Sequence, residues 1–381
     1  MSVSLTIRAY NVLFGDSILV SWDEDDGQHH AWIDFGNFPT DPNAVFEVVY
    51  EDVRTRTAGV LDLVAVTHRH LDHLEGFFSL RDRFAQEFQI ARLWHAHVRA
   101  EFDNVFKLAN DAALRLLPEG LADSPGDVGA LYRNNDPLTT SDRMDGILQT
   151  FPVAQADQFA IHRQLDLTAG ALPSGMQRMQ VKVLAPEEDS GVYLRPLEDA
   201  LAPGRKIASS LQSALEAHVG ADSLDDASPF ERLADFRRLR RKIRTGGVRI
   251  LAAVDNTRNN TSIVMRWTYE GVRVLLTGDA EETSWEVMRG NGVDFSSEVL
   301  KVGHHGSINA SPAWSFDRVF PAVEDRNVAI VSTDPTQFTG ENEVPKAEVV
   351  TGWTGKMQDP ARFLRTDSVP LGQSVSVTFD T

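Results

Sequence analysis

Short runs of apolar and alternating residues recur along the chain, and most of them predict β-strands. Residues 5–10 and 17–22 alternate between apolar and polar positions, whereas residues 61–66 are almost continuously apolar, which is typical of a buried strand. Helical spacing is expected over residues 75–88 and 281–291. Further strands are expected over residues 31–34, 91–94, 179–185, 248–253, 261–269, 272–277, 298–302, 328–332 and 374–379.

Two stretches break the strand pattern. Residues 98–175 begin with helical spacing of apolar residues and continue in loops rich in proline, glycine and aspartate. Residues 187–247 have a charged, helical pattern that ends at two glycines. We find no internal repeat and no low-complexity tract. We therefore predict one domain of the α/β (α+β) class over residues 1–381, with largely helical insertions at 98–175 and 187–247.

The composition narrows the class of protein. Of the 381 residues, 42% are hydrophobic and 24% are charged, as in ordinary folded globular domains. No apolar run approaches the roughly 20 residues needed to cross a bilayer. The first residues alternate like a strand and lack the basic and apolar regions of a signal peptide. We therefore expect a cytoplasmic protein that does not bind membranes.

The chain contains no cysteine. This excludes disulfides, thiolate metal ligands and a cysteine nucleophile, and it fits a reducing compartment. Any metal ion would have to be held by imidazole nitrogens and carboxylate oxygens.

The formal net charge of −18 argues against an extended nucleic-acid footprint, because proteins that coat nucleic acid are usually basic. The negative net charge does not exclude a small cationic cleft. A local basic run is compatible with phosphate binding, but a solvated helix that pairs with nearby acidic residues is the simpler interpretation. The run consists of Arg237, Arg238, Arg240, Arg241, Lys242, Arg244 and Arg249.

The histidines carry the strongest chemical signal. Seven of the eleven lie in three groups, at 68/70/73, 95/97 and 304/305, and each group directly follows an apolar strand. His68 and His70 alternate, so an extended backbone points both imidazoles the same way. Asp72 and His73 follow as the chain turns into a helix. This spacing can serve two adjacent metal ions, and a solvated polar loop rarely has it.

Two later motifs are ambiguous when each is taken alone. Asp279 follows a buried strand and a glycine, and such a carboxylate is either a helix N-cap or a metal ligand. His304 and His305 follow another strand between glycines, where they are either a polar turn or ligands.

Taken together, these stretches resemble the metallo-β-lactamase superfamily, in particular the branch represented by the metallo-hydrolase domain of the competence DNA-uptake channel. The resemblance follows the chain in order and covers most of it outside the two insertions. It is carried by residues 11–20, 32–36, the histidine motif 67–76, and residues 183–186, 259–264, 276–279 and 301–307.

The resemblance implies a four-layer αββα sandwich with two divalent metal ions at one edge, zinc or alternatively manganese. Asp279 would bridge the ions, and Asp34 would orient a ligand imidazole, unless it is only a strand-end turn residue. His305 would replace His304 as a ligand, contact the substrate or donate a proton. The implied ligands are His68, His70, Asp72, His73, Asp279 and His304.

The chain departs from the family pattern at three points. Many members have a ligand histidine where this chain has Ala185-Pro186, so we expect a weaker first metal site or recruitment of His95 or His97. Leu13-Phe14-Gly15 precedes Asp16 in place of the branch's usual residues, which puts the role of Asp16 in doubt. The branch has a histidine-proline pair late in the chain, and this chain has Val344-Pro345 in its place. Any role of that histidine in substrate handling is therefore absent.

These features predict a metal-dependent hydrolase, a phosphodiesterase or nuclease in which a metal-bridged hydroxide attacks the substrate. Asp72 and His305 are the catalytic candidates, and the expected substrate is a phosphodiester such as single-stranded DNA or RNA. Protein partners are not indicated. One alternative is hydrolysis of a small ester, lactone or phosphocholine-like group. Another is a binding or scaffold protein with a degenerate site, which the absent histidine favours and the intact 68–73 cluster opposes.

Overall fold

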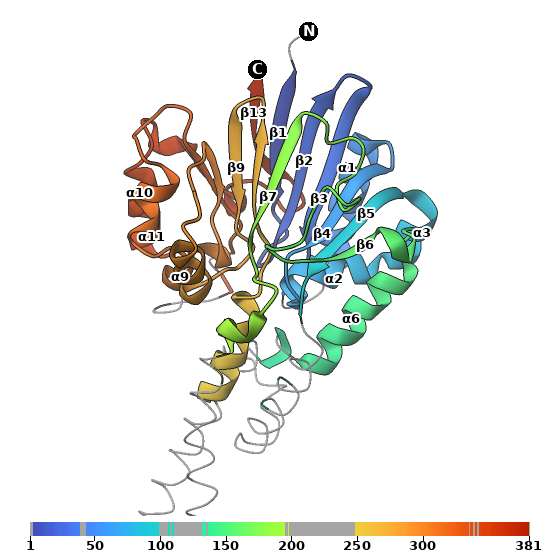
Figure 1. Ribbon diagram of the computed structural model, residues 1–381, viewed down its shortest axis with the longest axis horizontal. Helices are drawn as coiled ribbons and strands as arrows, with labels where there is room; N and C mark the ends of the chain where they lie inside the picture. The colour runs from blue at the N-terminus through green and yellow to red at the C-terminus, as the bar shows by residue number, and fades with distance from the viewer. Residues whose placement is uncertain are drawn as a thin grey trace, which may run out of the picture. The chain divides into compact units, whose positions relative to one another are not determined.

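A computed structural model describes residues 3–38, 43–98, 106, 109, 132–134, 136–194, 197, 248–334, 336–337, 340 and 343–380. Contacts divide the chain into two compact units. The first comprises residues 1–98, 138–190 and 258–381, and the second comprises residues 99–137 and 191–257. The first unit is a mixed α/β structure with two sheets and helices, as the sequence predicts (Figure 1). None of the described helices is long and apolar enough to cross a membrane.

The larger sheet has seven strands within the described residues, in the order β13-β1-β2-β3-β4-β5-β6. β3, β4, β5 and β6 run parallel to one another, whereas β13, β1 and β2 pair antiparallel. The bounds are β1 (Ser4–Tyr10), β2 (Ser17–Glu24), β3 (Gly27–Phe35), β4 (Val60–Val66), β5 (Gln89–Ala96), β6 (Gln158–Ile161) and β13 (Ser374–Asp380).

The second sheet, as far as the structure describes it, has six strands in the order β12-β11-β10-β9-β8-β7. The central strands β9, β10 and β11 are parallel, and β7 and β8 are antiparallel. The bounds are β7 (Met179–Ala185), β8 (Val264–Tyr269), β9 (Val272–Leu276), β10 (Val299–Lys301), β11 (Val328–Val331) and β12 (Phe363–Arg365).

Buried apolar side chains of the described residues form three clusters. The first joins strands of both sheets, including Ile33 of β3 and Met265 of β8, so the two sheets pack against each other. The second joins the other face of the larger sheet to helices α1 (Asn43–Thr57), α2 (Leu71–Ser79), α3 (Arg81–Glu87) and α6 (Pro137–Thr150). The third joins the second sheet to helices α9 (Glu282–Gly290), α10 (Ser315–Val319) and α11 (Ala347–Thr354).

The parallel strands bring distant loops together. The carboxyl ends of neighbouring parallel strands meet at one sheet edge, where ligand sites of such sheets usually lie. Asp34 lies near the end of β3, and the 68–73 motif follows β4. Asp279 follows β9, and His305 follows β10. The topology therefore places all four segments at strand ends.

Three expectations differ from the structure. Residues 43–57, to which we assigned no helix, form α1. Residues 248–253, predicted as a strand, are helical. Residues 138–175, which we placed in the first insertion, belong to the first unit, because α6 contributes to its core and β6 pairs with β5. Most of residues 187–247 lie outside the described residues.

Candidate metal centre

The histidine motif is built by the junction of β4 and α2. The strand ends at Val66, and α2 begins at Leu71 with His70 as its extended N-cap residue. Asp72 and His73 therefore lie in the first helical turn, and both are buried. The helix begins where the alternating imidazoles end, which is the arrangement that the sequence predicts for residues 68–73.

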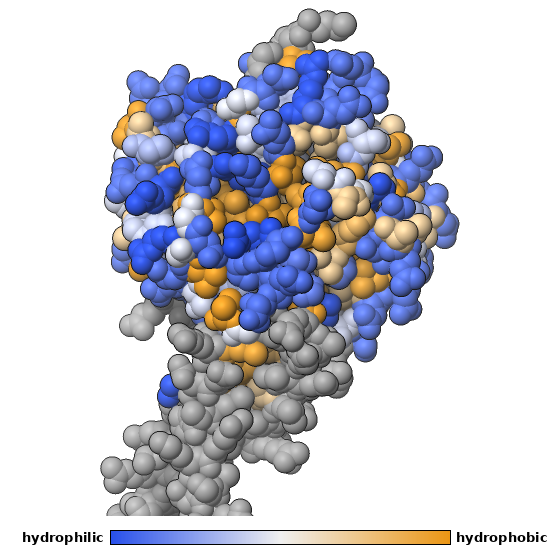
Figure 2. Space-filling view, viewed as in Figure 1, coloured by the Kyte–Doolittle hydropathy of each residue, from blue (hydrophilic) through white to orange (hydrophobic). Residues whose placement is uncertain are grey.

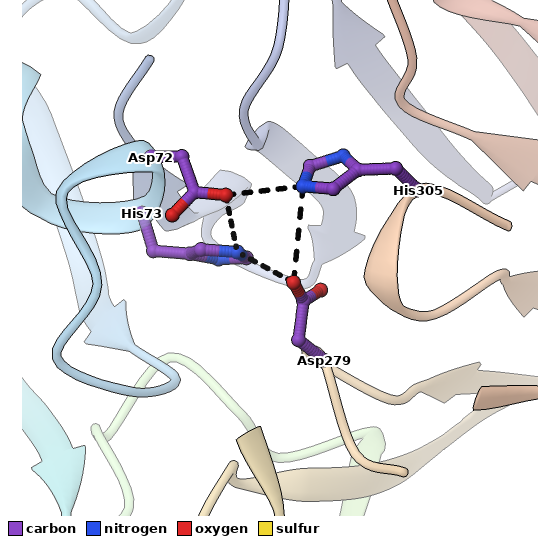
Figure 3. Close-up of side chains that lie close together, drawn as sticks. All are labelled: Asp72, His73, Asp279 and His305. Atoms are coloured by element: carbon purple, nitrogen blue, oxygen red, sulfur yellow. Dashed lines mark hydrogen bonds and ion pairs between the residues drawn. The ribbon is translucent and has the colours of Figure 1, made fainter. Parts of the chain in front are cut away.

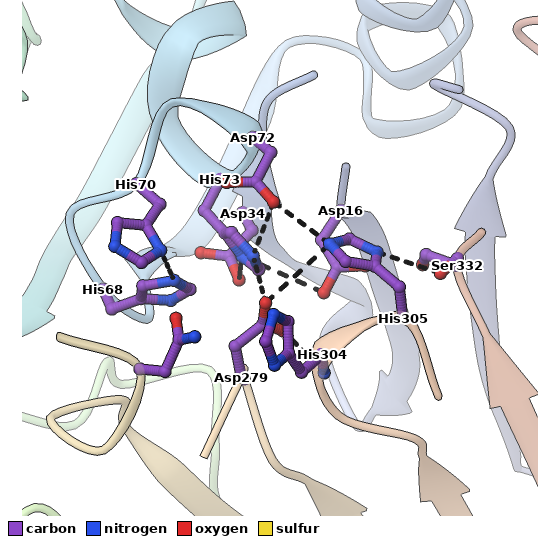
Figure 4. Close-up of polar contacts among 12 residues, drawn as sticks. Asp16, Asp34, His68, His70, Asp72, His73, Asp279, His304, His305 and Ser332 are labelled. Carbon is purple, nitrogen blue, oxygen red and sulfur yellow. Dashed lines mark hydrogen bonds and ion pairs between the residues drawn. The ribbon is translucent and has the colours of Figure 1, made fainter. Parts of the chain in front are cut away.

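Asp34 ties this motif to β3. Its Oδ1 accepts the backbone N–H of Thr67 at 2.7 Å, and its Oδ2 accepts the Thr67 hydroxyl at 2.7 Å. The same Oδ2 lies 2.9 Å from Nδ1 of His73. All of these groups are buried. Asp34 therefore fixes the orientation of the His73 ring, with Nε2 pointing away from β3 (Figure 4).

Four buried side chains from three segments converge around one point (Figure 3). Their donor atoms all lie within 4.8 Å of one another, and the residues are Asp72, His73, Asp279 and His305. Nε2 of His305 lies 3.0 Å from Oδ2 of Asp72, and Nε2 of His73 lies 3.2 Å from Oδ2 of Asp279. Two carboxylates and two imidazoles in a tight buried group can hold a divalent metal ion.

The hydrogen bonds of the two imidazoles fit such an ion. Nδ1 of His305 lies 3.0 Å from the backbone oxygen of Ser332, which can only accept, so Nδ1 carries a proton. Nδ1 of His73 has the Asp34 carboxylate as its acceptor. In both rings the second nitrogen, Nε2, faces the carboxylates of Asp72 and Asp279. An orienting acceptor behind each imidazole is the usual support of metal-binding histidines.

The pKa values of these side chains depend strongly on their neighbours. Burial alone would lower the pKa of His73, but the neighbouring carboxylates, Asp279 first among them, raise it well above its ordinary value. Burial would raise the pKa of Asp279, but His73 outweighs it and holds that pKa well below the usual range. The carboxylates are therefore anionic, and they require positive charge in this buried place.

His68 and His70 lie beside this group. The ring centroid of His68 is 4.1 Å from that of His73, and Nε2 of His68 lies 3.0 Å from Nδ1 of His70. Burial lowers the pKa of His70 to about 3, and burial with the nearby His73 holds the pKa of His68 well below its ordinary value. Both imidazoles are therefore neutral at pH 7, the state in which they can bind metal.

The two histidines that follow β10 have different surroundings. His305 is fully buried and faces Asp72. The His304 side chain is 23% exposed, and its Nδ1 lies 2.9 Å from Oε1 of the buried Glu281. Its backbone N–H donates to Oδ1 of Asp279 at 2.9 Å. Of the pair, the structure brings His305, rather than the expected ligand His304, into the four-residue donor group.

Backbone conformation marks the same segments. Asp34, His304 and His305 have φ values of 54°, 45° and 53°. Residues other than glycine rarely adopt positive φ, and where they do so the surrounding structure must hold them. The left-handed turn at His304 and His305 decides which imidazole points toward Asp72.

A buried ion pair supports the loop before β2. Nζ of Lys301 lies 2.7 Å from Oδ2 of Asp16, and both side chains are almost fully buried. The backbone N–H of Asp16 donates to the carbonyl of Asp72 at 2.9 Å, and Oδ2 of Asp16 lies 3.9 Å from Nδ1 of His73. Asp16, Asp34 and His73 also form a buried group of clustered donors. Sequence analysis singled out neither Lys301 nor Glu281 as a site residue, and it left the role of Asp16 in doubt.

The remaining candidate residues are His95, His97 and the basic run. His95 and His97 are absent from the clustered donor groups that the described residues form. Nδ1 of His95 lies 3.2 Å from the carbonyl of Ala96, and the His97 ring lies 5.1 Å from that of His162. The basic run lies outside the described residues except for Arg249.

The comparisons with known proteins add no support for the site, so its geometry is the evidence for it. No protein-family model matches the chain, and no curated protein matches it.

Proposed function

We propose that this chain is a metal-dependent hydrolase with the metallo-β-lactamase fold, acting on phosphodiester bonds. The observation that carries the proposal is the convergence of Asp72, His73, Asp279 and His305 in one buried donor group. Two packed sheets with helices against their other faces, and the order of the motifs along the chain, support the αββα sandwich.

Asp72, His73, Asp279 and His305 would hold one divalent ion, and His68 with His70 would contribute to a second beside it. The ions, zinc or manganese, would lower the pKa of water and stabilise negative charge on the scissile phosphoryl group. Asp34 would keep the His73 ring in the orientation that presents Nε2.

His304 would lie at the exposed side of this centre. Its side chain is the partly exposed member of the His304–His305 pair, and its Nδ1 lies 2.9 Å from Oε1 of Glu281. The imidazole would then contact a substrate, and its backbone N–H, which donates to Oδ1 of Asp279, would orient that carboxylate.

A substrate screen tests the proposal. Protein loaded with zinc or manganese is assayed against bis-p-nitrophenyl phosphate, single-stranded DNA, RNA and a panel of carboxylic esters. We expect turnover of phosphodiesters that is abolished by Asp279→Asn and kept by Asp325→Asn, which removes an exposed carboxylate elsewhere. Turnover of esters alone would instead identify an ester or lactone hydrolase. Absence of all turnover and of bound metal would identify a binding protein.

A further inference from the structure

A cavity lies at β7, which is an edge strand of the second sheet as far as the structure describes it. Its volume is about 560 Å³, in the size range of small-molecule sites. Its walls come from the loop before β7, from β7 and β8, and from the residues that follow α9. None of its lining residues belongs to the clustered donors of the metal centre. Three of them are basic: Arg163, Lys182 and Arg266.

Two of these cations face each other directly across the sheet. Lys182 of β7 is the antiparallel partner of Arg266 of β8. Directly opposed residues project from the same face of a sheet, and like charges in that position destabilise the pair. An anion bound beside the two cations would offset this repulsion.

The acidic residues nearby leave this repulsion partly uncompensated. Asp294 accepts a hydrogen bond from Nη1 of Arg266 at 2.6 Å, and Glu187 holds Arg163 at 2.7 Å. The Lys182 side chain, by contrast, makes no ion pair or hydrogen bond with any residue in the described ranges. Asp166 also lines the cavity, but its Oδ1 accepts the backbone N–H and the hydroxyl of Thr168.

Arg266 also has an unused donor. Its Nε is buried and has no hydrogen-bond partner among the described residues. A buried guanidinium N–H without an acceptor is costly, and an anion bound beside it would remove that cost. Arg266 and Lys182 both line the same cavity.

Part of the remaining lining is apolar, and part is polar, with Asp166, Asn291 and Asp294. The apolar lining residues include Leu165, Leu167, Val181, Leu184 and Val293. Figure 2 shows an apolar area flanked by hydrophilic side chains on the face where β7 is turned toward the viewer. A cavity with opposed cations and apolar walls suits a ligand with a compact dianionic group and an organic part.

The geometry points to a binding site for a small organic phosphate, held by Lys182 and Arg266 and separate from the metal centre. The phosphate oxygens accept from the Lys182 ammonium and from the Arg266 guanidinium, and the organic part packs on the leucine and valine side chains. A dianion compensates the opposed cations, which a neutral ligand does not.

Calorimetric titration of the whole chain with adenosine monophosphate, inorganic phosphate and adenosine tests the site. We expect saturable binding of the two phosphates and none of adenosine. Lys182→Glu should weaken binding by at least about tenfold, because it removes a charged donor and adds a repelling carboxylate. Arg318→Ala, which removes an exposed cation from α10, should leave binding unchanged.

Thermal unfolding without ligand gives an independent readout. Lys182→Glu places opposite charges across β7 and β8, so its unfolding midpoint should lie at or above that of the wild type. A stable variant that no longer binds phosphate supports the site. The proposal is overturned if neither phosphate binds, if Lys182→Glu binds as tightly as wild type, or if Arg318→Ala weakens binding equally. None of these results depends on hydrolase activity.

Discussion

The ammonium of Lys301 lies 2.7 Å from the carboxylate of Asp16, although the two residues are 285 positions apart in the chain. Lys301 is the one lysine that is buried among the residues the structure describes. The pair connects β10, which precedes His305, to the loop that contacts the backbone of Asp72. It therefore joins two segments of the metal centre.

Removing either partner of this pair should destabilise the fold. Lys301→Met leaves the Asp16 carboxylate buried without its cation, and such a loss costs about 3–5 kcal/mol. The double variant Asp16→Leu/Lys301→Met should be more stable than either single variant, because no charge remains uncompensated. Urea denaturation measures all four proteins. A double variant no more stable than Lys301→Met would show that the pair does not act as a unit.

His305 and His304 should differ in their effect on metal binding. His305→Ala removes a buried imidazole that faces Asp72, and zinc affinity should fall about 100-fold or more. His304→Ala removes a partly exposed ring and should lower zinc affinity by less than about tenfold. Calorimetric titration with zinc measures both variants. The assignment of His305 to the donor group is wrong if the order of the two effects is reversed.

The close approach of β3 and α2 depends on Gly36. A Cβ at this position would lie 2.4 Å from the backbone nitrogen of His73 and from the carbonyl carbon of Asp72. Gly36→Ala should therefore cost about 1–3 kcal/mol of stability, as overpacking does, and weaken metal binding.

Gly290 provides the matched control for this substitution. It ends α9, and a Cβ there meets nothing within 4 Å. Gly290→Ala should be neutral or stabilise the protein by up to about 1 kcal/mol. Denaturation curves compare the two variants, and equal stabilities would contradict the packing of Gly36 against α2.

Acid should destabilise the protein partly through His30. Burial lowers the pKa of His30 to about 4. The carboxylates of Asp62 and Asp23 oppose this shift without outweighing it, whereas His29 and Arg8 lower the pKa further. The folded pKa lies below the unfolded value of about 6.5, so the unfolded chain takes up the proton first. The stability that comes from keeping His30 neutral is complete above pH 6.5 and is lost as the pH falls toward 4.

Replacing His30 by glutamine tests this pH dependence. The stability of His30→Gln should improve relative to wild type as the pH falls from 7 to 5, because the substituted side chain takes up no proton. Urea denaturation at several pH values measures the difference. A difference that stays constant over this range would show that His30 does not titrate as described.

The sequence predicted the parts of the site that lie close together in the chain. Residues 68–73 follow a continuously apolar strand, so both the strand end and the direction of the imidazoles follow from local pattern. Asp279 likewise follows the end of β9, as the apolar strand and the glycine before it predict. The mixed α/β class follows from the same strand patterns.

Other features have no local signal. Lys301 and Asp16 meet only because the two sheets pack against each other, and no residue spacing in the sequence predicts that contact. The choice between His304 and His305 depends on left-handed backbone angles within one turn. Helix α1 is a different case, because its buried residues Val45, Phe46, Val49, Tyr50 and Val53 have helical spacing that strand patterns around them obscured.

Zinc binding by the purified chain tests the central claim most directly. Calorimetric titration of the wild type should show saturable binding of at least one ion per chain, and Asp72→Asn/Asp279→Asn should bind at least about 100-fold more weakly. Circular dichroism checks that the variant remains folded. The account is contradicted if the wild type binds no zinc, or if a folded double variant binds it with unchanged affinity.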